Sequence, residues 1–167
     1  DKLAWIEWNK QMPWDQSSLM VGSIRTSGYI SPIKNIPGNI FNKQKKVSIF
    51  QPNWLNNHQL TISEDSTGWW NLKILNIHFE NDLLPTWENI SHIKSDFGLP
   101  QWVAGMSTTS CSENKIIALS CKNSRWKMIL IDKNSLVEEF NLPFEDLSSI
   151  DVSKDHAILI GSNSFEP

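Results

Sequence analysis

The sequence of 167 residues contains few cysteines and no long apolar run, and each of these absences excludes a class of protein. Its two cysteines, Cys111 and Cys121, are too few for a disulfide framework, and no zinc-ligand spacing surrounds them. We expect free thiols in a reducing compartment, which predicts a cytoplasmic location and no bound metal. No stretch of about 18 apolar residues occurs, so the sequence predicts neither a membrane-spanning helix nor a membrane partner.

Charge of one sign is not in excess either, because 15 lysines and arginines stand against 18 aspartates and glutamates, for a net charge of −3. A nucleic-acid partner would require a concentrated basic face. The one basic cluster, formed by Lys43, Lys45 and Lys46, is expected to be a solvated loop. The sequence also lacks a glycine-rich phosphate loop and a dinucleotide fingerprint. It therefore predicts no nucleic-acid partner and no cofactor.

Tryptophan is abundant, with nine residues, and several of them recur in an internal repeat. Residues 51–75 read QPNWLNNHQLTISEDSTGWWNLKIL, and residues 99–131 hold a weaker copy, LPQWVAGMSTTSCSENKIIALSCKNSRWKMILI. Trp54 and Trp102, which open the two copies, are 48 residues apart. A period of about 40–50 residues with several short strands is typical of β-propeller blades. Pro52 cannot donate a ladder hydrogen bond, so we expect it at a strand start or on an edge strand.

The repeat places six residues at blade positions that we expect to be structural, namely Pro52, Trp54, Trp70, Pro100, Trp102 and Trp126. Trp54, Trp70 and Trp102 are predicted to lie in strands and to be largely buried, because blades pack through recurring aromatic residues. The aromatic segments Trp69–Trp70 and Phe97–Trp102 have a second interpretation as an exposed binding patch. Packing between blades is the commoner use of tryptophans at such spacing.

The fold class predicted from these patterns is all-β, a partial β-propeller with about three blades of antiparallel strands. The second strands of successive units begin near Leu3, Leu60, Ile116 and Ala157, and turns are expected at Glu113–Asn114, Lys122–Ser124 and Asp132–Ser135. The units are roughly residues 1–46, 47–94 and 95–145, and another starts at 146–167. A closed propeller has roughly 4–8 blades. We therefore expect the 167 residues to be a fragment of a longer propeller domain.

No group of residues has the pattern of a catalytic centre. A serine hydrolase elbow requires G-x-S-x-G before a helix, and the nearest segment, Gly105–Thr109 (GMSTT), lacks the last glycine. The histidines share no motif and are expected at the surface or as hydrogen-bonded strand residues; they are His58, His78, His92 and His156. Paired acids fall in polar stretches and are expected to be solvated; they are Glu64, Asp65, Glu138, Glu139, Glu145 and Asp146.

The repeat resembles the propeller of bacterial family S9 peptidases, the prolyl oligopeptidase group that includes dipeptidyl aminopeptidases and acylaminoacyl-peptidases. Gln51–Leu75 is similar to the group's string "QPxW–SPDG–L–F–SD–GWWNLY", with LNNH at Leu55–His58 in place of SPDG and Lys73 where an aromatic residue is usual. Asp96–Met106, DFGLPQWVAGM, resembles "EFxxPQWVFGMSTY". Asp1–Ile24 resembles "LAWLEWxxPxMPWDxTELW". The resemblance covers most of residues 1–131.

The resemblance implies an N-terminal propeller joined to a C-terminal α/β-hydrolase domain, which carries the catalytic Ser, Asp and His of a serine protease. None of that domain lies in this sequence, so no catalytic residue is expected in the chain. The propeller of such peptidases restricts access to the active site, so the implied partners are the hydrolase domain and short peptide substrates. The residues alone leave two alternatives, a free-standing propeller-like module for protein interaction and a sugar-binding domain. An open fragment also predicts self-association through unpaired edges.

Overall fold

The computed structural model describes residues 1–9, 12–91, 93–132 and 137–165. These residues form 13 strands and a single short 3₁₀ turn at Gly38–Ile40, and no α-helix is found among them. All strand pairs are antiparallel, which confirms the all-β prediction. No helix of the described ranges is long and apolar enough to cross a membrane.

The strands are arranged in four sheets that follow one another along the chain. The first sheet contains β1 (Lys2–Glu7), β2 (Ser18–Ile24) and β3 (Ile30–Pro37). The second contains β4 (Ile49–Trp54), β5 (Gln59–Glu64), β6 (Asn71–Asn76) and β7 (Thr86–Asn89). The third contains β8 (Thr109–Ser112), β9 (Lys115–Lys122), β10 (Arg125–Asp132) and β11 (Val137–Phe140). The fourth pairs β12 (Asp146–Ser153) with β13 (His156–Ser162).

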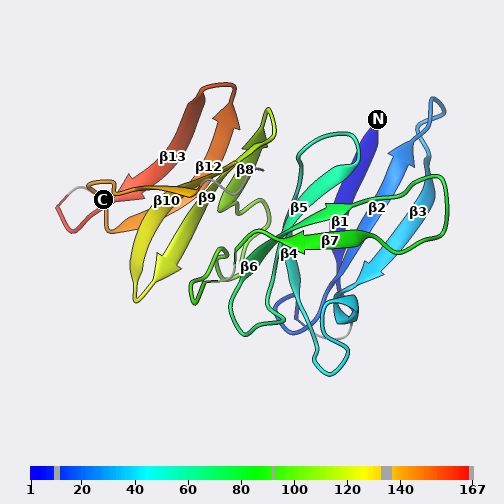
Figure 1. Ribbon diagram of the computed structural model, residues 1–167, viewed down its shortest axis with the longest axis horizontal. Helices are drawn as coiled ribbons and strands as arrows, with labels where there is room; N and C mark the ends of the chain where they lie inside the picture. Colours follow the sequence, from blue (N-terminus) through cyan, green and yellow to red (C-terminus); the bar gives the residue numbers. More distant parts are fainter. Residues whose placement is uncertain (10–11, 92, 133–136, 166–167) are drawn as a thin grey trace.

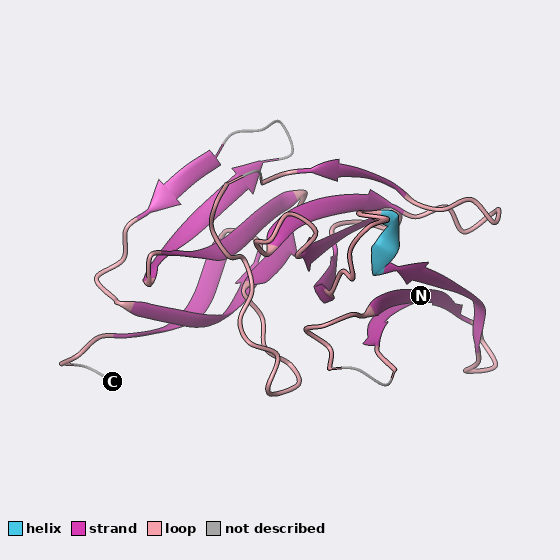
Figure 2. Cartoon of the chain, turned by 90° about the horizontal axis from the view of Figure 1, so that it is seen from below, coloured by secondary structure: helices cyan, strands magenta, loops and turns pink. Residues whose placement is uncertain are grey.

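The sheets pack in chain order, with the first strand of each sheet in contact with the first strand of the next: β1 contacts β4, β4 contacts β8, and β8 contacts β12. Figure 1 shows the first sheet at the right, the last two at the left, and the second sheet between them. The two ends of the chain lie far apart in both Figure 1 and Figure 2. The described strands therefore form an open arc of sheets, which confirms a partial propeller.

Tight turns at polar residues join β8 to β9 and β9 to β10. Glu113 and Asn114 have φ of 50° and 64°, and Asn123 and Ser124 have φ of 51° and 58°. Two successive residues with positive φ form the turn that best matches the twist of a β-hairpin. The turns predicted at Glu113–Asn114 and Lys122–Ser124 are thus confirmed, whereas the one at Asp132–Ser135 lies mostly outside the described residues.

Apolar residues fill the space between successive sheets. Leu19, Ile49 and Leu75 belong to a buried cluster between the first two sheets, and Leu72 belongs to a second cluster shared with the third sheet. Because successive side chains of a strand point to opposite faces, β6 can contribute to both clusters. A smaller cluster of Leu119, Leu147 and Ile150 joins the third and fourth sheets.

Of the predicted blade residues, Pro52, Trp54 and Trp126 lie in strands and Trp70 does not, and Trp54 and Trp70 are half-buried where we predicted them to be largely buried. Trp54 lies in β4 and Trp126 in β10, both half-buried. Trp70 directly precedes β6, is also half-buried, and packs edge-on against Phe50 with ring centroids 6.0 Å apart. Pro52 lies at an irregularity in β4, which is an edge strand of its sheet, as expected for a residue without an N–H.

The prediction that Trp102 is a buried strand residue is wrong. Trp102 is 72% exposed and lies with Pro100 in the loop between β7 and β8. The strand that corresponds to β4 is β8, which begins only at Thr109. The Pro-x-Trp sequence of the second copy therefore falls in a loop that precedes the strand, and the match of letters does not carry over to strand position.

The prediction that Glu64 is a solvated carboxylate is also wrong. Glu64 is the last residue of β5, is fully buried, and forms an ion pair with Lys73 of β6 at 2.9 Å. Glu64 pairs with Asn71 across the hairpin, and Lys73 lies two residues further along β6, so the two side chains share one face of the sheet. The backbone N–H and the hydroxyl of Ser66 also donate to the Glu64 carboxylate, at 2.7 and 3.0 Å.

One buried amide connects the second sheet to the segment that leads into the third. Gln51 of β4 has φ of 44°, in the left-handed region that side chains other than glycine rarely adopt. Its Nε2 lies 2.8 Å from the carbonyl oxygen of Phe97 and 2.6 Å from Oγ1 of Thr108. Its Oε1 accepts a hydrogen bond from the backbone N–H of Thr108 at 2.6 Å. Gln51 thus binds both ends of the loop that contains Trp102.

We predict that Lys73→Met lowers the free energy of unfolding by about 3–5 kcal/mol, because the substitution leaves the Glu64 carboxylate buried without its partner. The matched control is Lys127→Met, which removes the exposed pair of Lys127 with Glu139 at 2.6 Å and should change stability by less than about 1 kcal/mol. Urea unfolding followed by circular dichroism measures both. Equal effects of the two substitutions would contradict a structural role for the buried pair.

We predict that Gln51→Ala destabilises the chain by about 1–3 kcal/mol, because the Thr108 N–H is left without its acceptor. Gln51→Gly removes the same hydrogen bonds but relieves the backbone strain of a positive φ, so it should be about 1 kcal/mol more stable than Gln51→Ala. Urea unfolding of both variants separates the two effects. If the glycine variant were the less stable of the two, backbone strain at position 51 would be refuted.

Candidate functional site

The structure offers no nucleophilic serine in the segment where the sequence comes nearest to an elbow. Ser107 Oγ donates a hydrogen bond to the carbonyl oxygen of Thr109 at 2.8 Å. The chain then enters strand β8, whereas an elbow requires a helix at this point. Ser107 therefore has the geometry of a loop residue that stabilises its own backbone.

The other candidate groups are dispersed. No set of three His, Cys, Asp or Glu residues in the described ranges could hold a metal ion. His58 and His156 are exposed, and His156 lies beside Asp155 at 2.9 Å, whereas His92 lies outside the described residues. Burial raises the pKa of the Cys111 thiol, and burial followed by the charge of Asp96 raises that of Cys121. A raised pKa disfavours the thiolate, so neither cysteine is suited to act as a nucleophile.

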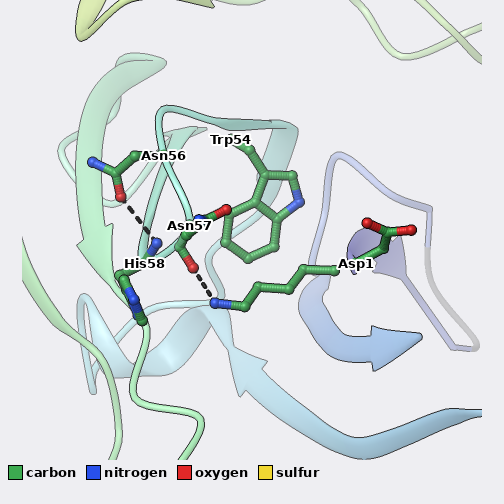
Figure 3. A pocket seen from close by; sticks show the side chains of 6 residues that line it. Asp1, Trp54, Asn56, Asn57 and His58 are labelled. Atoms are coloured by element: carbon green, nitrogen blue, oxygen red, sulfur yellow. Dashed lines mark hydrogen bonds between the residues drawn. The ribbon is translucent and has the colours of Figure 1, made fainter. Parts of the chain in front are cut away.

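A polar pocket of about 800 Å³ lies where the β4–β5 turn approaches the start of β1 (Figure 3). In the close-up, the side-chain oxygen of Asn56 accepts a hydrogen bond from the backbone N–H of His58 at 2.9 Å, and Lys2 Nζ donates to the backbone carbonyl oxygen of Asn57. The Trp54 indole, which also lines the pocket, packs against Phe79 with ring centroids 6.3 Å apart. These polar groups satisfy one another, so the pocket is explained by the turn that it surrounds.

A second cleft, of about 570 Å³, lies between β1, β4 and the loop that connects β7 to β8. We call it the aromatic cleft. Its aromatic and large apolar lining residues come from all three segments and include Trp5, Trp8, Phe50, Trp102, Val103 and Met106. None of the fourteen described residues that line it carries a formal charge. Large apolar clefts with a few polar groups are the usual form of small-ligand sites.

The wall of the aromatic cleft is a loop with a buried base and an exposed tip. At the base, Gln51 binds Phe97 and Thr108, as described above. At the tip, the Trp102 ring packs edge-on against Trp14 with centroids 4.8 Å apart. Trp14 belongs to the connection between β1 and β2, so the tip of the loop contacts the first sheet while its base is bound to the second. Loops with closely spaced ends of this kind are frequently functional.

One polar group at the aromatic cleft lacks a partner. The Gln101 Nε2 atom is buried, and no hydrogen-bond acceptor is found for it within the described part of the chain. Gln101 lines the cleft next to Trp102. Buried amide donors are nearly always hydrogen-bonded in folded proteins. Because Gln101 lines the cleft, its unpaired donor is a candidate partner for an acceptor on a ligand.

The sequence identified part of this site. Of the predicted aromatic segments, Phe97 is a core residue, Trp102 lines the cleft, and Trp69 does not line it. Sequence reasoning missed Trp5 and Trp8, which come together with Trp102 only in the fold. Three of the nine tryptophans fall in the first 14 residues, and that concentration is the one pattern that could have indicated them.

Comparison with known proteins identifies the fold. No family model matches the sequence, and no curated protein matches it. Among solved structures, a puromycin-hydrolyzing peptidase of Mycobacterium tuberculosis has a TM-score of 0.80 at 20% identity, covering 96% of this chain. A puromycin hydrolase gives 0.82 at 18% identity over 97% of the chain. A structure from a study of two prolyl endopeptidases gives 0.69 at 13% identity over 99%.

The chain spans about a quarter of the length of these structures, since the match covers 24%, 23% and 22% of them. Similarity at these identities is a similarity of fold. The described strands superpose on one region of the larger chains from end to end. The chain therefore shares its fold with part of each of these peptidases.

Proposed function

We propose that the chain is a non-catalytic part of the propeller of an S9-type serine peptidase. The observation that carries this proposal is the fold match at TM-scores of 0.80 and 0.82 over nearly the whole chain. The resemblance of Gln51–Leu75 and Asp96–Met106 to propeller sequences of the same group supports it independently. Strand positions and sequence motifs point to one family, although the overall identity is low.

In this proposal the partner of the chain is an α/β-hydrolase domain, which supplies the serine nucleophile and its general base. The propeller contributes by limiting which peptides reach that domain, which affects specificity and leaves the chemical step to the partner. The described residues are consistent with a propeller that takes no part in the chemical step, because Ser107 and the two thiols are unsuited to nucleophilic attack. We place the whole protein in the cytoplasm, in keeping with two free cysteines.

The position of the aromatic cleft supports a role in admitting peptides. The cleft lies beside β1 and β4, the two strands through which the first and second sheets contact each other. An uncharged, apolar cleft can accept a short peptide's side chains without burying its charged groups. Its exposed Trp102 also keeps one alternative open, a sugar-binding module, because exposed tryptophan is a stacking surface for ligands. A glycan array tests that alternative.

We predict that the 167-residue chain has no peptidase activity. A panel of aminoacyl and acyl-aminoacyl chromogenic peptides should show no turnover above background. The product of the complete reading frame should hydrolyse members of the same panel and lose that activity when the serine of a downstream G-x-S-x-G is changed to alanine. Turnover by the isolated chain that Ser107→Ala abolishes would overturn the proposal, as would a reading frame without any such elbow.

A further inference from the structure

We propose that the aromatic cleft binds a neutral, large apolar side chain of a peptide, and that Gln101 Nε2 donates a hydrogen bond to a backbone carbonyl beside that side chain. The inference deepens the proposed function and rests on it only in naming a peptide as the ligand. The binding chemistry follows from the lining of the cleft, its unpaired donor and the support of its wall.

The lining selects an apolar, uncharged group. Trp5, Trp8, Phe50 and Trp102 offer aromatic surface, and aromatic pairs gain stability beyond the area that they bury. No charged side chain lines the cleft within the described residues. An ammonium or carboxylate that entered would lose its hydration without gaining an ionic partner, which is unfavourable. The cleft therefore favours an internal aromatic or large aliphatic residue over a free amino acid.

The buried amide of Gln101 favours a ligand that carries a hydrogen-bond acceptor. A buried donor without an acceptor is unfavourable, and a ligand that supplies the acceptor recovers that cost on binding. An amide carbonyl is a neutral acceptor, and in a peptide one lies within two bonds of every Cα. A peptide residue thus presents two groups that complement the cleft. Its apolar side chain fits the aromatic lining, and its adjacent carbonyl oxygen can accept the hydrogen bond from Gln101.

The wall of the cleft is held in place before any ligand binds. Gln51 fixes the base of the loop through Phe97 and Thr108, and the contact with Trp14 supports Trp102 at the tip. Binding to a supported wall loses less conformational entropy than binding to a loop that must first become ordered. The interaction should therefore be measurable with a small probe.

The probe is N-acetyl-L-phenylalaninamide, which is neutral and carries a phenyl ring and amide carbonyls, and its comparator is L-phenylalanine, which is charged at both ends. Two-dimensional ¹H–¹⁵N NMR of the 167-residue chain should show saturable shifts of the Gln101 side-chain amide and the Trp102 indole with the neutral probe. L-phenylalanine should bind at least about tenfold more weakly, a difference of 1.4 kcal/mol. Equal binding of the two compounds, or no shifts up to the solubility limit, would overturn the inference.

Three variants test the residues. Trp102→Ala and Gln101→Leu should each weaken binding of the neutral probe by about tenfold, because one removes aromatic surface and the other the donor. Trp69→Ala is the matched control, since Trp69 is also exposed and does not line the cleft, and should leave binding unchanged. Shifts that persist in both test variants would contradict the assignment.

Failure of this inference can be distinguished from failure of the proposed function. The NMR titration measures binding without hydrolysis, whereas the complete reading frame reports hydrolysis. If the complete protein hydrolyses peptides and the chain does not bind the probe, only the inference fails. If the chain binds the probe and the reading frame encodes no hydrolase domain, the proposed function fails and the aromatic cleft stands as a binding site.

Discussion

Each sheet of this chain buries its apolar residues against the next sheet along the sequence, and the rest of the structure depends on that packing. Leu75 belongs to the cluster on one side of the second sheet and Leu72 to the cluster on the other. A sheet with apolar residues on both faces is stable only between two neighbours. The relative positions of the sheets are thus set by pairwise contacts, and any site formed between sheets depends on them.

The aromatic cleft is such a site, because its lining comes from the first sheet, the second sheet and the loop before the third. Gln51 connects two of these parts through a single side chain, with Phe97 and Thr108 as partners. Its positive φ coincides with the break in the β4–β5 pairing between Phe50 and Asn53. The strain of that residue is therefore explained by the loop that it holds.

The sequence predicted the elements of the fold better than the site. Alternating apolar residues gave strands such as β5 and β9, since burial on a sheet face produces a period of two. The burial of Glu64 was missed because its partner lies across a hairpin, and polarity alone does not show pairing. Trp102 was misplaced because local sequence similarity does not fix strand position. The contacts of Trp5 and Trp8 depend on how sheets meet, which no local pattern encodes.

The third apolar cluster is smaller than the other two, and this difference has a consequence for how the chain opens. Among the described residues, the cluster between the third and fourth sheets has Leu119, Leu147 and Ile150 as its buried members. In proteins built from neighbouring units, local opening proceeds where the interface is smallest. Amide hydrogens of β12 and β13 should therefore exchange with solvent before those of β5 and β6, which are enclosed on both sides. The chain would then open from its C-terminal sheet while the second sheet remains folded.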